Sequence, residues 1–147
     1  MPAGSDPLTL PHTWRPLGVR LAATFFGVLL LVVCIAAWLT LDPETRSRFS
    51  LLQRGTLILL GLAGFAAGFA LARSRVVAET SRLVVVNGYR RREYEWAEVL
   101  AVHLPPGAPW VVLDLADGTS APAMGIQGSD GDRARMAVRQ LRSLLNH

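Results

Sequence analysis

The chain contains 147 residues, of which 51% are hydrophobic, and its formal net charge of +4 comes from arginine without any lysine. The single cysteine, Cys34, excludes a disulfide within the chain. Arginine clusters can bind nucleic acid, but here they flank apolar stretches, which favours membrane anchoring and makes nucleic acid an unexpected partner.

Residues 1–18 are expected to form an irregular N-terminal tail, because they contain four prolines and show little periodicity. Trp14 and Arg15 stand directly before the first apolar stretch. An aromatic ring and a cation at this point suit the headgroup zone of a bilayer, so we expect both side chains to lie at the membrane interface.

Two apolar stretches dominate the front half of the chain, at residues 19–41 and 55–72. Arg20 is the only charged residue of the first stretch, and the second stretch has none. Because about 20 helical residues cross a bilayer core of about 30 Å, residues 19–75 are predicted to form a two-helix transmembrane hairpin. Five arginines flank its outer ends and three lie in its link, which favours a cytoplasmic location for both ends.

The second apolar stretch carries small residues at helical spacing, Gly61, Gly64 and Gly68, and the last two form a GxxxG pair. Small residues at this spacing let helix backbones approach each other closely. The pattern is compatible with packing against the first span of the same chain and with the seam of a homodimer.

Residues 76–147 change to period-two alternation with turn signals, which is typical of short antiparallel strands. Strands are expected at 76–79, 82–86, 89–96, 99–103, 110–115 and 120–124, followed by an amphipathic helix at 132–146. Ser129 or Asp130 is the expected N-cap of that helix. The sequence therefore predicts one small domain made of about six strands and a closing helix.

The pair Asn87-Gly88 predicts a β-hairpin with a type I′ turn, which needs positive φ at both central residues. A two-residue turn at these positions places Arg82 opposite Glu93, a pair of opposite charges. The residues then expected on the core face are Leu83, Val85, Tyr94 and Trp96.

This order of elements resembles the pleckstrin-homology-like barrel, a curved sheet plugged at one end by a C-terminal helix. The chain is similar to the bacterial PH-domain family of small two-span actinobacterial membrane proteins. The segments that carry the resemblance are 13–16, 95–99, 109–115 and 124–131. The resemblance implies a membrane α-hairpin plus an α+β domain, in which a PH-like antiparallel β-barrel or sheet is capped by the C-terminal α-helix. It implies no enzymatic activity.

Side chains that could support catalysis or bind a metal or cofactor are scattered along the chain. The polar and glycine candidates are His12, His103, His147, Asp114, Asp117, Asp130, Asp132, Gly125, Gly128 and Gly131. The histidines lack metal-ligand spacing, and the aspartates are typical of turns and helix N-termini. The glycines lack a following lysine and are flanked by acids, so they indicate a tight sheet-to-helix connection. We therefore expect no catalytic residue, metal or cofactor.

Arginines near the end of the second span are the most informative polar residues. The candidates for contact with lipid headgroups or a partner are Arg73, Arg75, Arg90, Arg91 and Arg92. Each arginine near an anionic leaflet contributes on the order of 1 kcal/mol to membrane association. The alternative is a solvated strand face on which the arginines pair with Glu93 and Glu95.

These observations favour a non-enzymatic docking module at the inner face of the cell membrane. Its expected partners are membrane lipids and an unidentified membrane or cytoplasmic protein, and a homodimer is compatible with the glycine spacing. The alternative is an accessory subunit of a transport or envelope-assembly complex that acts through the transmembrane hairpin.

Overall fold

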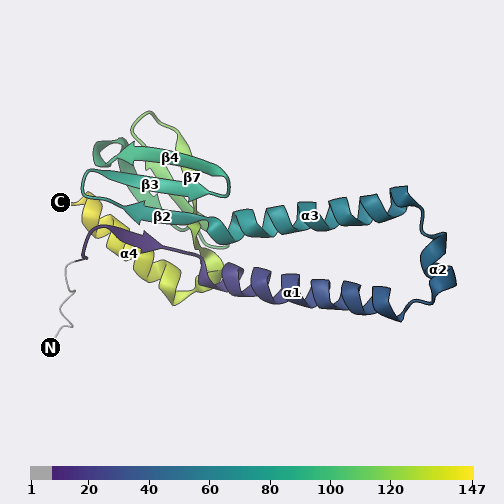
Figure 1. Cartoon of the computed structure of the whole chain (residues 1–147). Helices are drawn as coiled ribbons and strands as arrows, with labels where there is room; N and C mark the ends of the chain where they lie inside the picture. Colours follow the sequence, from purple (N-terminus) through teal and green to yellow (C-terminus); the bar gives the residue numbers. More distant parts are fainter. Residues whose placement is uncertain (1–7) are drawn as a thin grey trace.

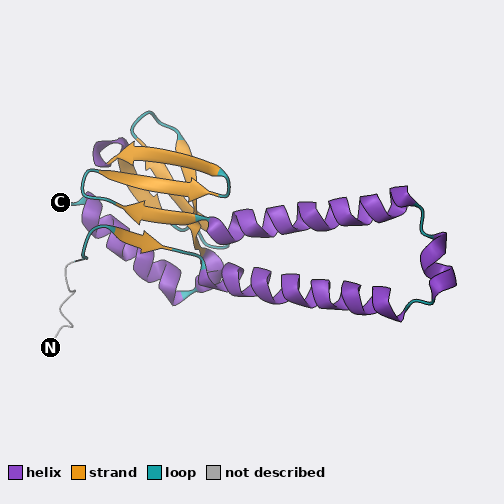
Figure 2. Cartoon of the chain, viewed as in Figure 1, coloured by secondary structure: helices purple, strands orange, loops and turns teal. Residues whose placement is uncertain are grey.

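Two long helices extend from one end of a β-sheet domain and are joined at their far ends by a short helix (Figure 1). The structure, a computed structural model, describes residues 8–147, so residues 1–7 of the expected tail lie outside it. The helices are α1 (Leu17–Thr40), α2 (Pro43–Arg48), α3 (Leu51–Arg73) and α4 (Asp132–Leu145), with 3₁₀ turns η1 (Trp96–Glu98) and η2 (Gly128–Asp130). The strands are β1 (His12–Trp14), β2 (Arg75–Ala78), β3 (Arg82–Asn87), β4 (Arg90–Glu95), β5 (Val99–His103), β6 (Trp110–Leu115) and β7 (Ser120–Gln127). All strands gather at the same end of the molecule (Figure 2).

Helices α1 and α3 are apolar along their length, and neither contains a buried residue. Each is long and apolar enough to cross a membrane, judged by length and composition. Two exposed apolar helices suggest membrane anchoring, because so much apolar surface is unfavourable in water. The helices match the predicted spans, except that α3 begins at Leu51, ahead of the predicted start at residue 55. Ser50 and Gln53 form a capping box that starts the helix early.

The link between the long helices is ordered around α2. Asp42 caps α2, since its carboxylate accepts the backbone N–H of Thr45 at 2.7 Å. The guanidinium of Arg46 donates to the carbonyl of Leu41 at 2.8 Å, where α1 ends. Arg54 in turn donates to the carbonyl of Arg46 at 2.7 Å. These bonds satisfy backbone N–H and carbonyl groups left free at the helix ends and give the turn a defined shape.

Strand β1 shows that the expectation of an irregular tail is wrong at residues 12–14. It pairs antiparallel with β2, with His12 opposite Ala78 and Trp14 opposite Val76. Trp14 is only 8% exposed, and its indole N–H donates to Gln140 of α4 at 3.0 Å. The side chain expected at the membrane interface therefore lies in the core of the domain, where indole burial is more favourable.

The long helices thus form an insertion between two neighbouring strands of one sheet. The first sheet has the order β1-β2-β3-β4, and the second has the order β5-β6-β7. β1 leads into α1, and α3 leads into β2 through Ser74. Because β1 and β2 lie side by side, both outer helix ends are held next to each other at the edge of the domain (Figure 1).

The hairpin between β3 and β4 has a different register from the predicted one. Asn87 pairs with Arg90, so the two central turn residues are Gly88 and Tyr89. Gly88 has φ of 60°, and no residue other than glycine has positive φ among residues 8–147. Positive φ at the first central residue alone fits a type II′ turn, so the predicted type I′ turn at Asn87-Gly88 is wrong. Arg82 lies opposite Glu95 instead of Glu93.

The core lies between the two sheets and α4. Leu83, Val85 and Tyr94 belong to it, as predicted, and Trp96 packs partly buried against it. The residues of α4 that are buried in the core are Ala134, Ala137, Val138 and Leu141. This apolar stripe confirms the amphipathic helix predicted at the C-terminus.

The glycine-rich segment before α4 allows close backbone crossings. A Cβ atom at Gly125 would lie 2.5 Å from the backbone of Arg75, and one at Gly128 would lie 2.6 Å from the carbonyl oxygen of Ala108. Gly131 has φ of 56°. These glycines therefore form the tight connection between sheet and helix that the sequence indicated. The last strand is longer than predicted, because β7 continues to Gln127.

Candidate membrane-facing site

The tip of the β3–β4 hairpin is attached to the end of α3. The backbone N–H of Gly88 donates to the hydroxyl of Ser74 at 2.9 Å, and that hydroxyl donates to the carbonyl of Ala70 at 3.0 Å. The phenol of Tyr89 donates to the carbonyl of Ala66 at 2.8 Å. The hairpin tip therefore lies along the last two turns of an apolar helix, at the level where α3 enters the domain.

Arg73 lies between two aromatic rings at this junction. Its guanidinium carbon is 5.9 Å from the ring centroid of Phe69 and 5.4 Å from that of Tyr89. Contacts of this kind contribute about 0.5–1 kcal/mol at exposed sites. Tyr89 and Ser74 were not among the predicted site residues. The position of Tyr89, directly after the turn glycine, could have indicated its role from the sequence. The role of Ser74 depends on a tertiary contact that the sequence does not reveal.

The three consecutive arginines of β4 point to both faces of the sheet. Arg91 lies opposite Val86, and its guanidinium pairs with Glu93 at 2.6 Å. Arg90 and Arg92 share the other face, since residues alternate along a strand. Both are exposed, and neither forms a hydrogen bond or an ion pair to any side chain of residues 8–147. The two alternatives from the sequence therefore apply to different arginines. Arg91 pairs with a glutamate of its own strand, whereas Arg90 and Arg92 remain available to anions.

Arg75 is half-buried at the start of β2, where β7 crosses its backbone. On the outer face of the sheet, Arg82 joins Glu79 and Glu93 at 2.7 Å each. The pKa of Arg82 is raised by its hydrogen bond to Glu79 and by the charges of both carboxylates. Of the predicted contact residues, Arg73 thus lies at the hairpin tip, next to Tyr89, the residue before Arg90. Arg75 lies instead where β2 and β7 cross.

Helix α1 is also hydrogen-bonded to the domain. The carboxylate of Asp130 accepts the backbone N–H groups of Leu17 at 3.1 Å and Gly18 at 2.9 Å. The prediction that Ser129 or Asp130 caps the C-terminal helix is therefore wrong. Gly131 occupies the N-cap of α4 without a side-chain bond, because Asp130 instead satisfies free N–H groups at the start of α1.

The small residues of α3 do not approach α1. Among residues 8–147, and apart from the nearby backbone of α3 itself, a Cβ atom added to Gly61, Gly64 or Gly68 would meet no atom within 4 Å. These glycines therefore do not serve to pack α3 against α1 of the same chain. In the described part of the chain, space for a side-chain atom remains beside these three positions of α3.

The polar candidates from the sequence have local roles where the structure describes them. His103 and Asp114 approach on neighbouring strands, with 3.4 Å between Nδ1 and a carboxylate oxygen. Asp117 accepts bonds from the hydroxyl and N–H of Thr119, which lower the pKa of its carboxyl group. Across residues 8–147, no group of three His, Cys, Asp or Glu side chains is placed to hold a metal ion.

Comparison with known proteins identifies the domain. Residues 73–144 match the protein family described as Bacterial PH domain. Over 141 residues the chain is 35% identical to the uncharacterized protein Rv1417 of Mycobacterium tuberculosis (strain ATCC 25618 / H37Rv), covering 95% of this chain and 88% of that protein. Uncharacterized protein Mb1452 of Mycobacterium bovis is similar to the same extent. No solved structure matches the chain. The match and the fold together establish that the chain belongs to the bacterial PH domain family.

Proposed function

We propose that the chain is a non-enzymatic docking module that holds a partner protein next to the inner face of the cell membrane. The observation that carries this proposal is the insertion of the helical hairpin between β1 and β2. Bonds from Asp130 to α1 and from the hairpin tip to α3 reinforce this attachment. A domain joined to two membrane helices without a flexible linker is suited to presenting a surface at a set height above the bilayer.

The pairing of β1 with β2 also supports a common side for the two outer helix ends. If both helices cross the bilayer, the described N-terminal segment and the domain must lie on the same side. The greater number of arginines at these ends supports the cytoplasmic side.

Anionic lipid headgroups are the proposed contacts of the hairpin tip. Arg73 and Arg90 flank Tyr89, whose phenol is bonded to an α3 carbonyl. Cations at the level where an apolar helix leaves the hydrocarbon region attract phosphate groups. Lipid contact would then orient the domain, while another surface remains free for a protein.

Hydrogen exchange in nanodiscs tests the lipid contact. The full chain is placed in nanodiscs with and without phosphatidylglycerol, and exchange of residues 87–92 is followed by mass spectrometry. Anionic lipid should slow this exchange, and the double variant Arg90→Ala/Arg92→Ala should abolish the effect. Arg91→Ala is the matched control, because Arg91 already pairs with Glu93. Equal loss in both variants would contradict the assignment of Arg90 and Arg92.

Crosslinking in native membranes tests the docking role. Photo-crosslinking residues are placed on the domain surface, and neighbouring proteins are identified by mass spectrometry. A reproducible protein neighbour at a defined position is expected. If no position on the domain gives a protein crosslink, the docking function fails.

An accessory subunit acting through the hairpin is the second candidate function. The open glycine faces of α3 favour it, because they offer close approach to a helix of another chain. Gly64→Leu/Gly68→Leu should then disrupt a membrane complex or a homodimer while the domain stays folded. A complex unchanged by this double variant would remove the basis for this candidate.

A further inference from the structure

A groove runs beside α4, between that helix, the edge of β5 and the loop before β6. It consists of two open hollows that share Arg142 as a lining residue. The one of about 260 Å³ lies along β5, and the one of about 880 Å³ lies between α4 and the loop at 104–109. Only the larger hollow has a volume within the range of ligand pockets. One wall is the loop at 104–109, which contains three prolines and is fixed by a bond from the N–H of Gly128 to the carbonyl of Pro109 at 2.9 Å. This wall is therefore formed in advance of any binding.

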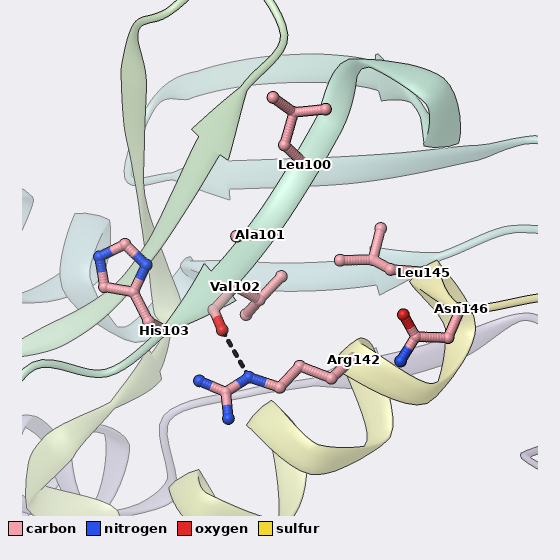
Figure 3. A pocket seen from close by; sticks show the side chains of 7 residues that line it. All are labelled: Leu100, Ala101, Val102, His103, Arg142, Leu145 and Asn146. Carbon is pink, nitrogen blue, oxygen red and sulfur yellow. Dashed lines mark hydrogen bonds between the residues drawn. The ribbon is translucent and has the colours of Figure 1, made fainter.

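The other side of the groove is the free edge of a sheet. Among residues 8–147, β5 is the end strand of its sheet and pairs with β6 alone. Figure 3 shows Arg142 reaching from α4 to β5, where its Nε donates to the carbonyl of Val102 at 2.7 Å. This carbonyl therefore faces away from β6. In an antiparallel strand the N–H of the same residue points the same way, so Val102 offers a donor and an acceptor to an added strand.

The helical wall of the groove is cationic. Arg135, Arg139 and Arg142 line it, and the charge of Arg135 is shared with exposed Asp132 at 3.1 Å. Within residues 8–147, neither Arg139 nor Arg142 is paired with a carboxylate. Exposed ion pairs such as that of Arg135 are weak and exchange easily. The groove thus has a surplus of positive charge on a chain that is itself positive overall.

Apolar side chains lie among these charges. Leu100 on β5 is 65% exposed, and Leu145 lines the same hollow from α4 (Figure 3). Val138 lines the larger hollow. A bound strand would therefore meet hydrogen-bonding backbone at its edge, apolar contacts on one set of side chains and arginines on the other.

We propose that this groove binds an acidic, extended segment of a partner protein, which adds as a strand to the edge of β5. The segment would replace Arg142 at the Val102 carbonyl and place carboxylates beside Arg139 and Arg142. The surplus of positive charge favours an acidic partner over a second copy of this basic chain. The backbone edge and the exposed leucine favour a peptide over a lipid headgroup. This inference rests on the proposed docking function and names the surface that performs it.

A synthetic peptide tests the groove directly. The probe is a fluorescein-labelled nine-residue peptide that alternates glutamate with valine, titrated against the full chain in nanodiscs made of zwitterionic lipid. Fluorescence anisotropy should show saturable binding that Arg139→Glu weakens by about tenfold, because an attraction becomes a repulsion. Arg133→Glu is the matched control, since Arg133 is exposed on the same helix but does not line the groove. It should leave the affinity unchanged.

The probe itself also has controls. The same peptide with N-methylated backbone amides cannot pair with a strand edge, and the version with lysine for glutamate reverses the charge. Both should fail to bind. Three results would overturn the proposed peptide site. The methylated peptide could bind as tightly as the unmodified one, Arg139→Glu and Arg133→Glu could weaken binding equally, or the glutamate peptide could fail to bind.

Membrane crosslinking separates this inference from the docking function. A photo-crosslinker at residue 100 should capture the protein neighbour, and one at residue 89 should not. Protein crosslinks from residue 89 but not from residue 100 would refute peptide binding in the groove, while remaining consistent with the docking function. The absence of protein crosslinks from the whole domain would instead remove the docking function.

Discussion

The carboxylate of Asp130 accepts the backbone N–H of Gly18 at 2.9 Å, although the two residues are 112 positions apart. Gly18 lies in the first turn of α1, and a Cβ atom there would be 3.0 Å from the same carboxylate. Asp130, which follows β7, thus caps the N-terminus of α1, a helix that precedes most of the domain in the chain. This contact joins the C-terminal part of the domain to the first apolar helix.

Asp130→Ala should therefore loosen the start of α1. Replacing a capping carboxylate costs about 1 kcal/mol, and the loss should appear as faster hydrogen exchange at Leu17 and Gly18. Asp132→Ala is the control, because Asp132 lies in the first turn of α4 and accepts a hydrogen bond from Arg135 of the same helix. Hydrogen exchange at Leu17 and Gly18 that is as slow in Asp130→Ala as in the unmodified chain would contradict the capping role.

Trp14→Ala should destabilise the PH-like domain, even though Trp14 precedes the two long apolar helices. Removal of a buried tryptophan side chain typically costs about 3–5 kcal/mol, and here the hydrogen bond to Gln140 is lost as well. Chemical unfolding of the full chain in detergent, followed by the fluorescence of Trp96 and Trp110, measures the change. Arg15→Ala, at the exposed neighbouring position, should have little effect. Equal stability of the two variants would argue that β1 is dispensable.

Asn87→Ala should weaken the contact between the two sheets. The Asn87 side chain donates to the carbonyl of Pro122 at 2.7 Å and accepts the N–H of Met124 at 2.9 Å. One of these bonds is exposed and the other is part-buried, so losing each should cost about 0.5–1.5 kcal/mol. Asn87→Asp keeps the acceptor for Met124 and removes the donor, so an intermediate loss of unfolding free energy is expected. A result in which the aspartate variant is the less stable of the two would refute this account.

Two glycine substitutions should give opposite results. Gly125→Ala places a Cβ atom 2.5 Å from the backbone of Arg75, and crowding of this kind typically costs about 1–3 kcal/mol. Gly61→Ala meets no atom within 4 Å in the same chain, so the fold should tolerate it. Thermal unfolding of both variants in one detergent makes the comparison. Destabilisation by Gly61→Ala in the monomer would show a contact within the chain that the structure lacks.

The sequence was sufficient to predict the long apolar helices and the C-terminal helix, whose signals are local. Apolar length predicted α1 and α3, because a bilayer requires about 20 apolar residues in a row. The spacing of Ala134, Val138 and Leu141 predicted α4, because one helical face must be buried. The alternating directions of the three arginines on β4 follow from strand geometry.

Only the tertiary structure determined which distant residues meet. Pairing of Trp14 with Val76 requires a helical hairpin to return to its starting point, and no short-range pattern in residues 12–14 encodes that pairing. Asp130 has the local features of a cap for α4, yet the free N–H groups of α1 lie within its reach and compete for it. The β3–β4 register likewise depends on the bonds of Asn87 to β7 and of Gly88 to Ser74. Local propensity restricts the choices, and contacts between distant segments select among them because their free energies exceed the small differences between turn types and caps.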